Sequence, residues 1–255
     1  PRLQEMATEN PLVIETKLLK SIITETAFAA SLQESRPILT GVHMVLSDHK
    51  DFKAVATDSH RMSQRKLTLD NTSNDFNVVI PSKSLREFAA VFTDDIETVE
   101  VFFSDSQMLF RSDYISFYTR LLEGNYPDTD RLLTNSFETK VTFNTGALRS
   151  AMERAHLISN ATQNGTVKLE ITNNSISAHV NSPEVGKVNE ELDIIDQSGS
   201  DLTISFNPTY LIEALKALKS ETVVIRFISP VRPFTLMPGD DAENFIQLIT
   251  PVRTN

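Results

Sequence analysis

The chain has 255 residues, of which 40% are hydrophobic and 23% charged, and its formal net charge is -10. This length suits one large domain or two ordinary ones, and the composition predicts a packed core. The acidic balance argues against tight nucleic-acid binding over the whole surface, because a negative protein repels phosphates. The lack of cysteine excludes disulfides and thiolate metal sites, and it favours a reducing, cytoplasmic location.

The chain starts at Pro1 instead of Met, so we expect a fragment of a longer protein. No apolar run approaches the roughly 18 residues that a membrane span needs, and no signal-peptide pattern opens the chain. The sequence therefore predicts no membrane association.

The first half predicts strand, helix, helix and then short strands. A strand ends at Thr16, which we expect to cap a helix, and a second helix is expected to follow Pro81, where a missing N–H costs little. Apolar residues at helical spacing mark the buried face of the first helix: Leu19, Ile22 and Ile23. Alternating apolar residues predict three antiparallel strands: Val99, Val101 and Phe103; Met108 and Phe110; Ile115 and Phe117.

The second half repeats this order. Thr145 is the expected cap of the third helix, and Pro208 begins the fourth. The third helix buries Leu148, Met152 and Ala155, and the strands are marked by Val167, Leu169 and Ile171; Ile176, Ala178 and Val180; Val223, Ile225 and Phe227. The repeat predicts two tandem α+β domains, 1–135 and 136–255, each with two helices packed on antiparallel sheets. Duplication of a stable unit would explain it without any function.

Positive charge is concentrated on the predicted helices, although the chain as a whole is acidic. The basic residues are Lys17, Lys20, Lys83, Arg86, Arg149, Arg154, Lys216 and Lys219. For any single lysine, a solvated helix face is a sufficient explanation. If the helices share one side of the molecule, these residues would instead offer a diffuse surface that holds DNA loosely and without sequence readout.

The sequence lacks the usual catalytic and cofactor motifs. The seven glycines form no phosphate-binding loop, the five histidines show no metal-ligand spacing, and no serine-nucleophile elbow is present. We therefore expect no catalytic residue, no metal and no cofactor. A hydrolase or nuclease with an unrecognised carboxylate site and an independent DNA-binding module stay open as alternatives.

The segment Ala54–Met62 resembles the signature Ala-Thr-Asp-Gly-His-Arg-(Leu/Met) of the bacterial sliding clamp, the beta subunit of DNA polymerase III. Arg36–Gly41, Gly124–Asp128 and Ile249–Arg253 also resemble that family. Ser59 stands where the signature usually has glycine, so we expect a narrowed pocket floor or a disturbed glycine-only backbone angle. The resemblance covers the whole chain as domains two and three of a three-domain protomer, which implies that the amino-terminal domain is missing.

The resemblance implies a non-catalytic DNA replication processivity factor within a DNA polymerase holoenzyme. Full-length members form a head-to-tail homodimeric ring that encircles double-stranded DNA without sequence specificity, with the basic helix residues facing the DNA. Leu157 and Ile158 match hydrophobic positions at the ring interface, although one of them could simply be core. The implied partners are the DNA polymerase III alpha subunit, the clamp loader and repair proteins, each bound through a Gln-Leu-x-Leu-Phe-type peptide motif.

The same resemblance implies a peptide-binding groove between the two domains. Its expected residues are Arg36, Leu39, Thr57, Ser59, His60, Arg61, Met62, Pro127, Arg131, Leu132, Tyr210, Val231, Pro233, Leu248, Thr250, Pro251, Val252 and Arg253. Its aliphatic members can desolvate apolar anchors, its arginines can bind backbone or acidic flanks, and Met62 adds deformability. A structural turn stabilised by Asp58 is the alternative role of His60 and Arg61, and the two roles are compatible.

Overall fold

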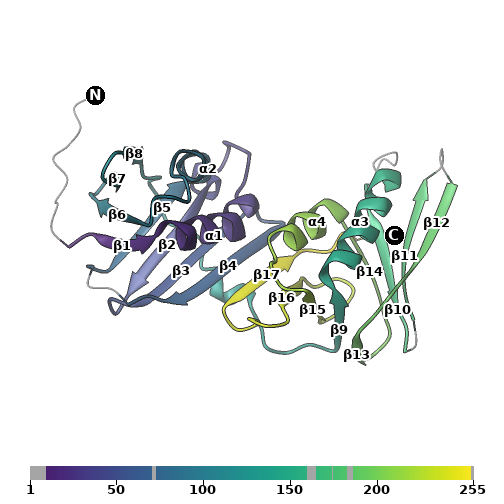
Figure 1. Ribbon diagram of the computed structural model, residues 1–255. Helices are drawn as coiled ribbons and strands as arrows, with labels where there is room; N and C mark the ends of the chain where they lie inside the picture. The colour runs from purple at the N-terminus through teal and green to yellow at the C-terminus, as the bar shows by residue number, and fades with distance from the viewer. Residues whose placement is uncertain (1–9, 71–72, 160–164, 174, 183–185, 254–255) are drawn as a thin grey trace. The chain divides into compact units, whose positions relative to one another are not determined.

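The computed structural model describes residues 10–70, 73–159, 165–173, 175–182 and 186–253, whose elements are labelled in Figure 1. The backbone divides into two compact units, one ending at Thr129 and the other beginning at Asp130. The sequence predicts the domain boundary after Asn135, near Thr134–Glu138. None of the helices formed by the described residues is long and apolar enough to cross a membrane.

The first unit contains two antiparallel sheets of four strands. One sheet has the order β1-β6-β7-β8, formed by Leu12–Glu15, Thr98–Phe103, Gln107–Arg111 and Ser116–Arg120. The other has the order β4-β3-β2-β5, formed by Arg61–Thr68, Asp51–Thr57, Gly41–Ser47 and Phe76–Pro81. The predicted strands at Val99, Met108 and Phe117 are confirmed as β6, β7 and β8.

Two helices, α1 (Thr16–Thr26) and α2 (Ser82–Val91), pack on these sheets. The predicted helical stripe is confirmed, since Leu19, Ile22 and Ile23 are all buried. From α2, the ring of Phe88 stacks on Phe92 and lies 4.5 Å from Phe110 of β7, measured between centroids. Short 3-10 helices at Ala27–Ala29 and Pro37–Thr40 complete the unit.

The second unit repeats this plan, as the sequence predicted. Its first sheet has the order β13-β9-β15-β16-β17, formed by Asp196–Gly199, Thr139–Asn144, Thr222–Phe227, Phe234–Pro238 and Phe245–Ile249. The second has the order β12-β11-β10-β14, formed by Gly186–Leu192, Ile176–Ser182, Val167–Ile171 and Leu202–Phe206. The helices are α3 (Thr145–Ser159) and α4 (Pro208–Lys216), and a 3-10 turn spans Asp130–Leu132.

The predicted threonine caps are wrong. Thr16 and Thr145 are the first residues of α1 and α3, and both hydroxyls are buried without a hydrogen-bond partner in the described part of the chain. Asn144 caps α3 instead, because its Oδ1 accepts from Ala147 N–H at 2.9 Å. Asn207 caps α4 by accepting from Thr209 N–H at 2.9 Å. A capping side chain must come from the residue before the first helical turn, and there the threonine lies one position too late.

Candidate functional site

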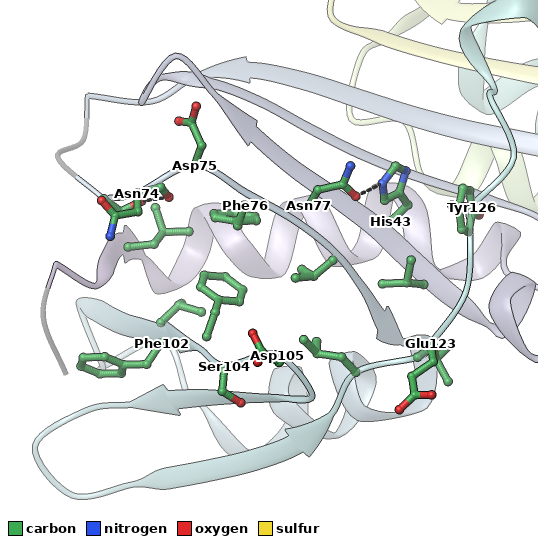
Figure 2. A pocket seen from close by; sticks show the side chains of 18 of the residues that line it. His43, Asn74, Asp75, Phe76, Asn77, Phe102, Ser104, Asp105, Glu123 and Tyr126 are labelled. Atoms are coloured by element: carbon green, nitrogen blue, oxygen red, sulfur yellow. Dashed lines mark hydrogen bonds between the residues drawn. The ribbon is translucent and has the colours of Figure 1, made fainter. Parts of the chain in front are cut away.

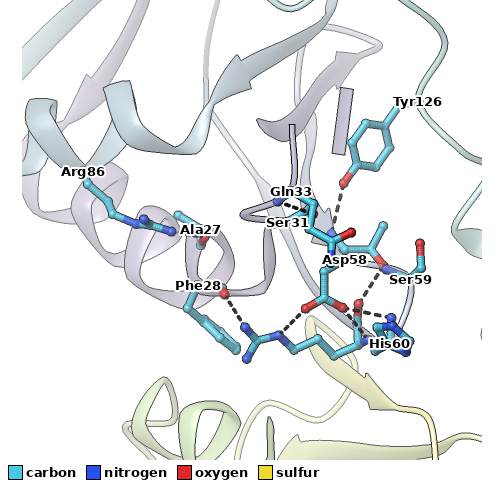
Figure 3. A network of polar contacts seen from close by, with 11 residues as sticks. Ala27, Phe28, Ser31, Gln33, Asp58, Ser59, His60, Arg86 and Tyr126 are labelled. Atoms are coloured by element: carbon cyan, nitrogen blue, oxygen red, sulfur yellow. Dashed lines mark hydrogen bonds and ion pairs between the residues drawn. The ribbon is translucent and has the colours of Figure 1, made fainter. Parts of the chain in front are cut away.

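The turn between β3 and β4, which carries the signature residues, is fixed by side-chain hydrogen bonds (Figure 3). Asp58 Oδ1 accepts from the backbone N–H groups of His60 at 2.9 Å and Arg61 at 3.0 Å. Thr57 Oγ1 accepts from Ser59 N–H at 3.2 Å and donates to the carbonyl of Arg61 at 2.6 Å. Such local bonds give the backbone one conformation, so the turn presents the exposed Ser59 and His60 from a rigid base.

Arg61 supports the turn from beneath. Its Nε donates to Asp58 Oδ2 at 2.9 Å, and its Nη2 donates to the carbonyl of Phe28 at 3.0 Å. The guanidinium also lies 5.5 Å from the centroid of the Phe28 ring, within the range of a cation–π contact. Arg61 therefore has the structural role that the sequence left open for it, and a bound peptide would meet it only at its remaining surface.

Ser59 adopts the backbone conformation that usually favours glycine, with φ at 78°. A side chain in this left-handed region costs roughly 1–2 kcal/mol, and the surrounding bonds must offset that cost. Arg36 Nη1 donates to Ser59 Oγ at 3.3 Å, so the serine also contacts the segment before the 3-10 helix Pro37–Thr40. The glycine-type angle is thus kept with serine in place.

The aliphatic residues expected to line the groove divide by burial. Leu39, Met62 and Leu248 are at most 5% exposed, so a peptide anchor would reach them only after the atoms covering them move. Leu132, Val231 and Val252 are between 39% and 56% exposed. Periodicity marks both sets as apolar, but it cannot separate a core residue from the wall of a groove.

The remaining expected groove residues lie at or near the surface of their own units. Pro127, Arg131 and Arg253 are exposed, while Tyr210, Pro233, Thr250 and Pro251 are half-buried. The end of the second unit is held by the N–H of Val252, which donates to the carbonyl of Ser205 in β14 at 2.7 Å. This bond fixes the backbone that carries Pro251, Val252 and Arg253.

Most of the predicted DNA-facing residues have polar partners within the chain. Arg86 Nη2 donates to the carbonyl of Ala27 at 2.8 Å. The other contacts are ion pairs: Lys20 with Asp94 at 2.6 Å, Arg149 and Lys216 with Glu153 at 4.0 and 3.6 Å, and Arg154 with Glu190. Lys17, Lys83 and Lys219 are exposed, but Lys219 lies beyond the end of α4 and not on the helix as the sequence predicted. Surface ion pairs are weak, so the acidic partners reduce the attraction of these basic side chains for phosphates without removing it.

These pairs also shift two pKa values. The hydrogen bond and charge of Lys20 lower the pKa of Asp94 below its ordinary value, and the hydrogen bond to Glu190 raises the pKa of Arg154.

Leu157 and Ile158 lie near the end of α3. Leu157 is 75% exposed, whereas Ile158 is half-buried. Beside Leu157, a cleft of about 310 Å³ separates α3 from α4, with Glu153, His156 and Lys216 on its walls. Leu157 is therefore an accessible apolar side chain, whereas Ile158 is partly exposed and partly packed against its neighbours.

Sequence reasoning missed Tyr126. Its ring stacks on His43 with the centroids 4.8 Å apart, at one end of a cleft of about 900 Å³ in the first unit (Figure 2). Its hydroxyl accepts from the N–H of Thr57 at 3.1 Å. Burial raises the pKa of Tyr126 above its ordinary value, and the nearby charge of Asp58 acts in the same direction. Its place in the motif Gly124–Asp128 was the available signal.

The residues that the structure describes contain no group of three His, Asp or Glu side chains that could hold a metal ion.

Comparisons with known proteins cover both units. The family model for the central domain of the DNA polymerase III beta subunit matches residues 13–128, and that for its C-terminal domain matches residues 130–253. The chain is 71% identical to the beta sliding clamp of Streptococcus pneumoniae, across 100% of this chain and 68% of that protein.

Two solved structures have the same fold. The DNA polymerase beta subunit of Streptococcus pyogenes has a TM-score of 0.97 at 84% identity, covering 100% of this chain and 68% of that one. The sliding clamp of Bacillus subtilis has a TM-score of 0.95 at 39% identity, covering 100% and 67%. This chain therefore belongs to the bacterial sliding-clamp family, the beta subunits of DNA polymerase III, which act in DNA replication as non-catalytic processivity factors.

Proposed function

We propose that this chain docks partner peptides of the Gln-Leu-x-Leu-Phe type, and that the DNA polymerase III alpha subunit, the clamp loader and repair proteins are held in this way. Sliding clamps bind polymerase and DNA as ring-shaped dimers, so a docking site for partners fits the family role. The observation that carries the proposal is the fixed turn between β3 and β4, which displays Ser59 and His60 without needing to be ordered by the ligand. A preorganised site loses less entropy on binding.

The second unit also carries exposed side chains suited to docking a peptide. From the second unit, the exposed Leu132, Val231 and Val252 supply apolar contacts, while Arg131 and Arg253 supply hydrogen-bond donors. Burying an aliphatic side chain fully contributes about 1.5–3 kcal/mol. After the cost of association, such contacts support a micromolar affinity, about -8 kcal/mol.

Calorimetry with the peptide Gln-Leu-Ala-Leu-Phe tests the proposal. We expect micromolar binding that weakens at least tenfold in Val252→Asp, because a charge would replace an apolar contact. Ile195→Asp is the matched control, since Ile195 is a similarly exposed aliphatic residue of the second unit outside the expected groove. Absence of binding by the unsubstituted chain, or equal weakening in both variants, would contradict the proposal.

We further propose that the basic side chains of α1 to α4, together with Lys219 beyond the end of α4, face double-stranded DNA without reading its sequence. Support comes from the exposed Lys17, Lys83 and Lys219 and from pairs such as Lys20 with Asp94, which leave only weak attraction for phosphates. The exposed Leu157 suits the proposed head-to-tail contact with a second protomer. DNA affinity measured against salt should be weak and decline further in Lys17→Glu with Lys83→Glu. Submicromolar, sequence-dependent binding would contradict it.

A further inference from the structure

The backbone N–H of Thr57 lies beyond the end of the hydrogen-bond ladder between β2 and β3. In β3, the N–H groups of Val55 and Thr57 point to the same side, toward β2, because successive residues of a strand alternate. Among the described residues, the ladder between β2 and β3 ends at the pair His43 and Val55, so it provides no residue of β2 to accept a hydrogen bond from the N–H of Thr57. The hydroxyl of Tyr126 takes this place at 3.1 Å. Without this hydroxyl, the N–H of the buried Thr57 would be left unpaired, which is unfavourable.

Tyr126 is itself held firmly. Its ring stacks on the imidazole of His43 at an interplanar angle of 28°, and His43 Nε2 lies 2.7 Å from Asn77 Oδ1 on β5 (Figure 2). Burial keeps the hydroxyl protonated by raising the pKa of Tyr126. The Tyr126 hydroxyl is therefore a neutral acceptor with a fixed position, whereas a surface water in its place would be mobile.

Thr57 connects this anchor to the turn. Its side-chain oxygen binds both the N–H of Ser59 and the carbonyl of Arg61, so a shift of the Thr57 backbone moves both ends of the turn. Ser59 is in a left-handed conformation that persists only while its neighbours enforce it. The turn therefore depends on the position of Thr57 more than an unstrained turn would.

We propose that Tyr126 is a positioning residue for peptide docking: its hydroxyl fixes Thr57, and Thr57 fixes the conformation in which Ser59 and His60 are displayed. This inference rests on the proposed peptide docking by the same turn. Tyr126 itself need not contact the peptide, and it acts through the Thr57 backbone.

The test is Tyr126→Phe, which removes the hydroxyl and keeps the ring that stacks on His43. Tyr114→Phe is the matched control, because Tyr114 belongs to the same unit and is almost fully exposed. We expect the Gln-Leu-Ala-Leu-Phe peptide to bind Tyr126→Phe about threefold to tenfold more weakly, in line with the loss of one hydrogen bond. Amide exchange at Thr57 and Ser59 should be faster in this variant, while Tyr114→Phe should match the unsubstituted chain.

The outcomes separate this inference from the function on which it rests. Thermal unfolding identifies a general loss of stability, which would speed amide exchange throughout the first unit and not only in the turn. Unchanged peptide affinity in Tyr126→Phe, with the unsubstituted chain binding normally, would overturn the positioning role alone. No binding by the unsubstituted chain would refute the proposed docking and this inference with it.

Discussion

Replacing Asp58 with alanine tests whether its carboxylate holds the turn between β3 and β4. The change removes the acceptor for the backbone N–H groups of His60 and Arg61 and for the Arg61 guanidinium. The side chains of Arg61 and Asp58 are only 12% and 14% exposed, so water replaces the lost contacts poorly. Arg61 would keep the carbonyl of Phe28 as an acceptor, but its charge would be left without the carboxylate.

The expected loss follows from this burial. Removing one partner of a buried ion pair costs about 3–5 kcal/mol, and the residual exposure here places the loss at the lower end, about 3 kcal/mol. With a urea dependence of about 1.5 kcal/mol per molar, the unfolding midpoint of the first unit should fall by about 2 M. The double variant Asp58→Ala with Arg61→Leu should lose less stability than the two single variants added together, because no unpaired charge remains in it.

Hydrogen exchange across residues 41–68 in rising urea isolates the first unit, since two units need not unfold in one transition. Asp94→Ala is the control, because its ion pair with Lys20 lies on the surface and its loss should leave exchange unchanged. If Asp58→Ala retains the protection of the unsubstituted chain, the carboxylate does not hold the turn.

Three further predictions concern local features. Ser59→Val should destabilise the first unit by about 1–2 kcal/mol, because a β-branched residue fits a φ of 78° poorly, while Ser59→Gly should not; urea unfolding compares them. Asn144→Ala should destabilise the second unit by about 1 kcal/mol through loss of the α3 cap. Thr145→Val should be neutral or stabilising, and a larger loss in Thr145→Val than in Asn144→Ala would contradict the cap assignment. The pKa of Asp94 should lie below 3.8 by NMR titration and rise in Lys20→Ala, and an unchanged pKa in Lys20→Ala would exclude Lys20 as the cause. Because the folded pKa is lowered, the attraction between the two side chains is present above pH 3.8 and is lost as the pH falls through the folded pKa, but at this exposed site its effect on stability should be too small to change amide exchange.

Burial also changes which substitutions can test the groove. Met62 and Leu248 belong to the groove expected from the sequence, so Met62→Asp and Leu248→Asp would be natural tests of peptide binding, but both residues are nearly fully buried. A charge at either site would be expected to unfold the protein, since an unpaired buried charge is strongly unfavourable. Exposed positions such as Val252 separate binding from stability.

The repeated plan and the buried faces were predictable from sequence wherever apolar residues alternate clearly. The stripe of α1 and the strands β6, β10 and β15 followed from periods of 3.6 and 2, because one face of each is buried. The signature around Asp58 also indicated the family, because it is a run of adjacent residues. These features depend on local patterns, which a single sequence contains in full.

Other features were decided only by tertiary structure. The strand β13, Asp-Gln-Ser-Gly, has no apolar residue and exists because β9 provides its hydrogen-bond partners. Met62 is buried by its packing, which the sequence does not show. The hydrogen bonds from Arg61 to the carbonyl of Phe28 and from Thr57 to the hydroxyl of Tyr126 connect residues far apart in the chain. The sequence alone determined the two-domain plan and the position of the signature turn, since periodicity and motifs are local. Which side chains that turn exposes, and which hold it in place, depended on packing between distant segments.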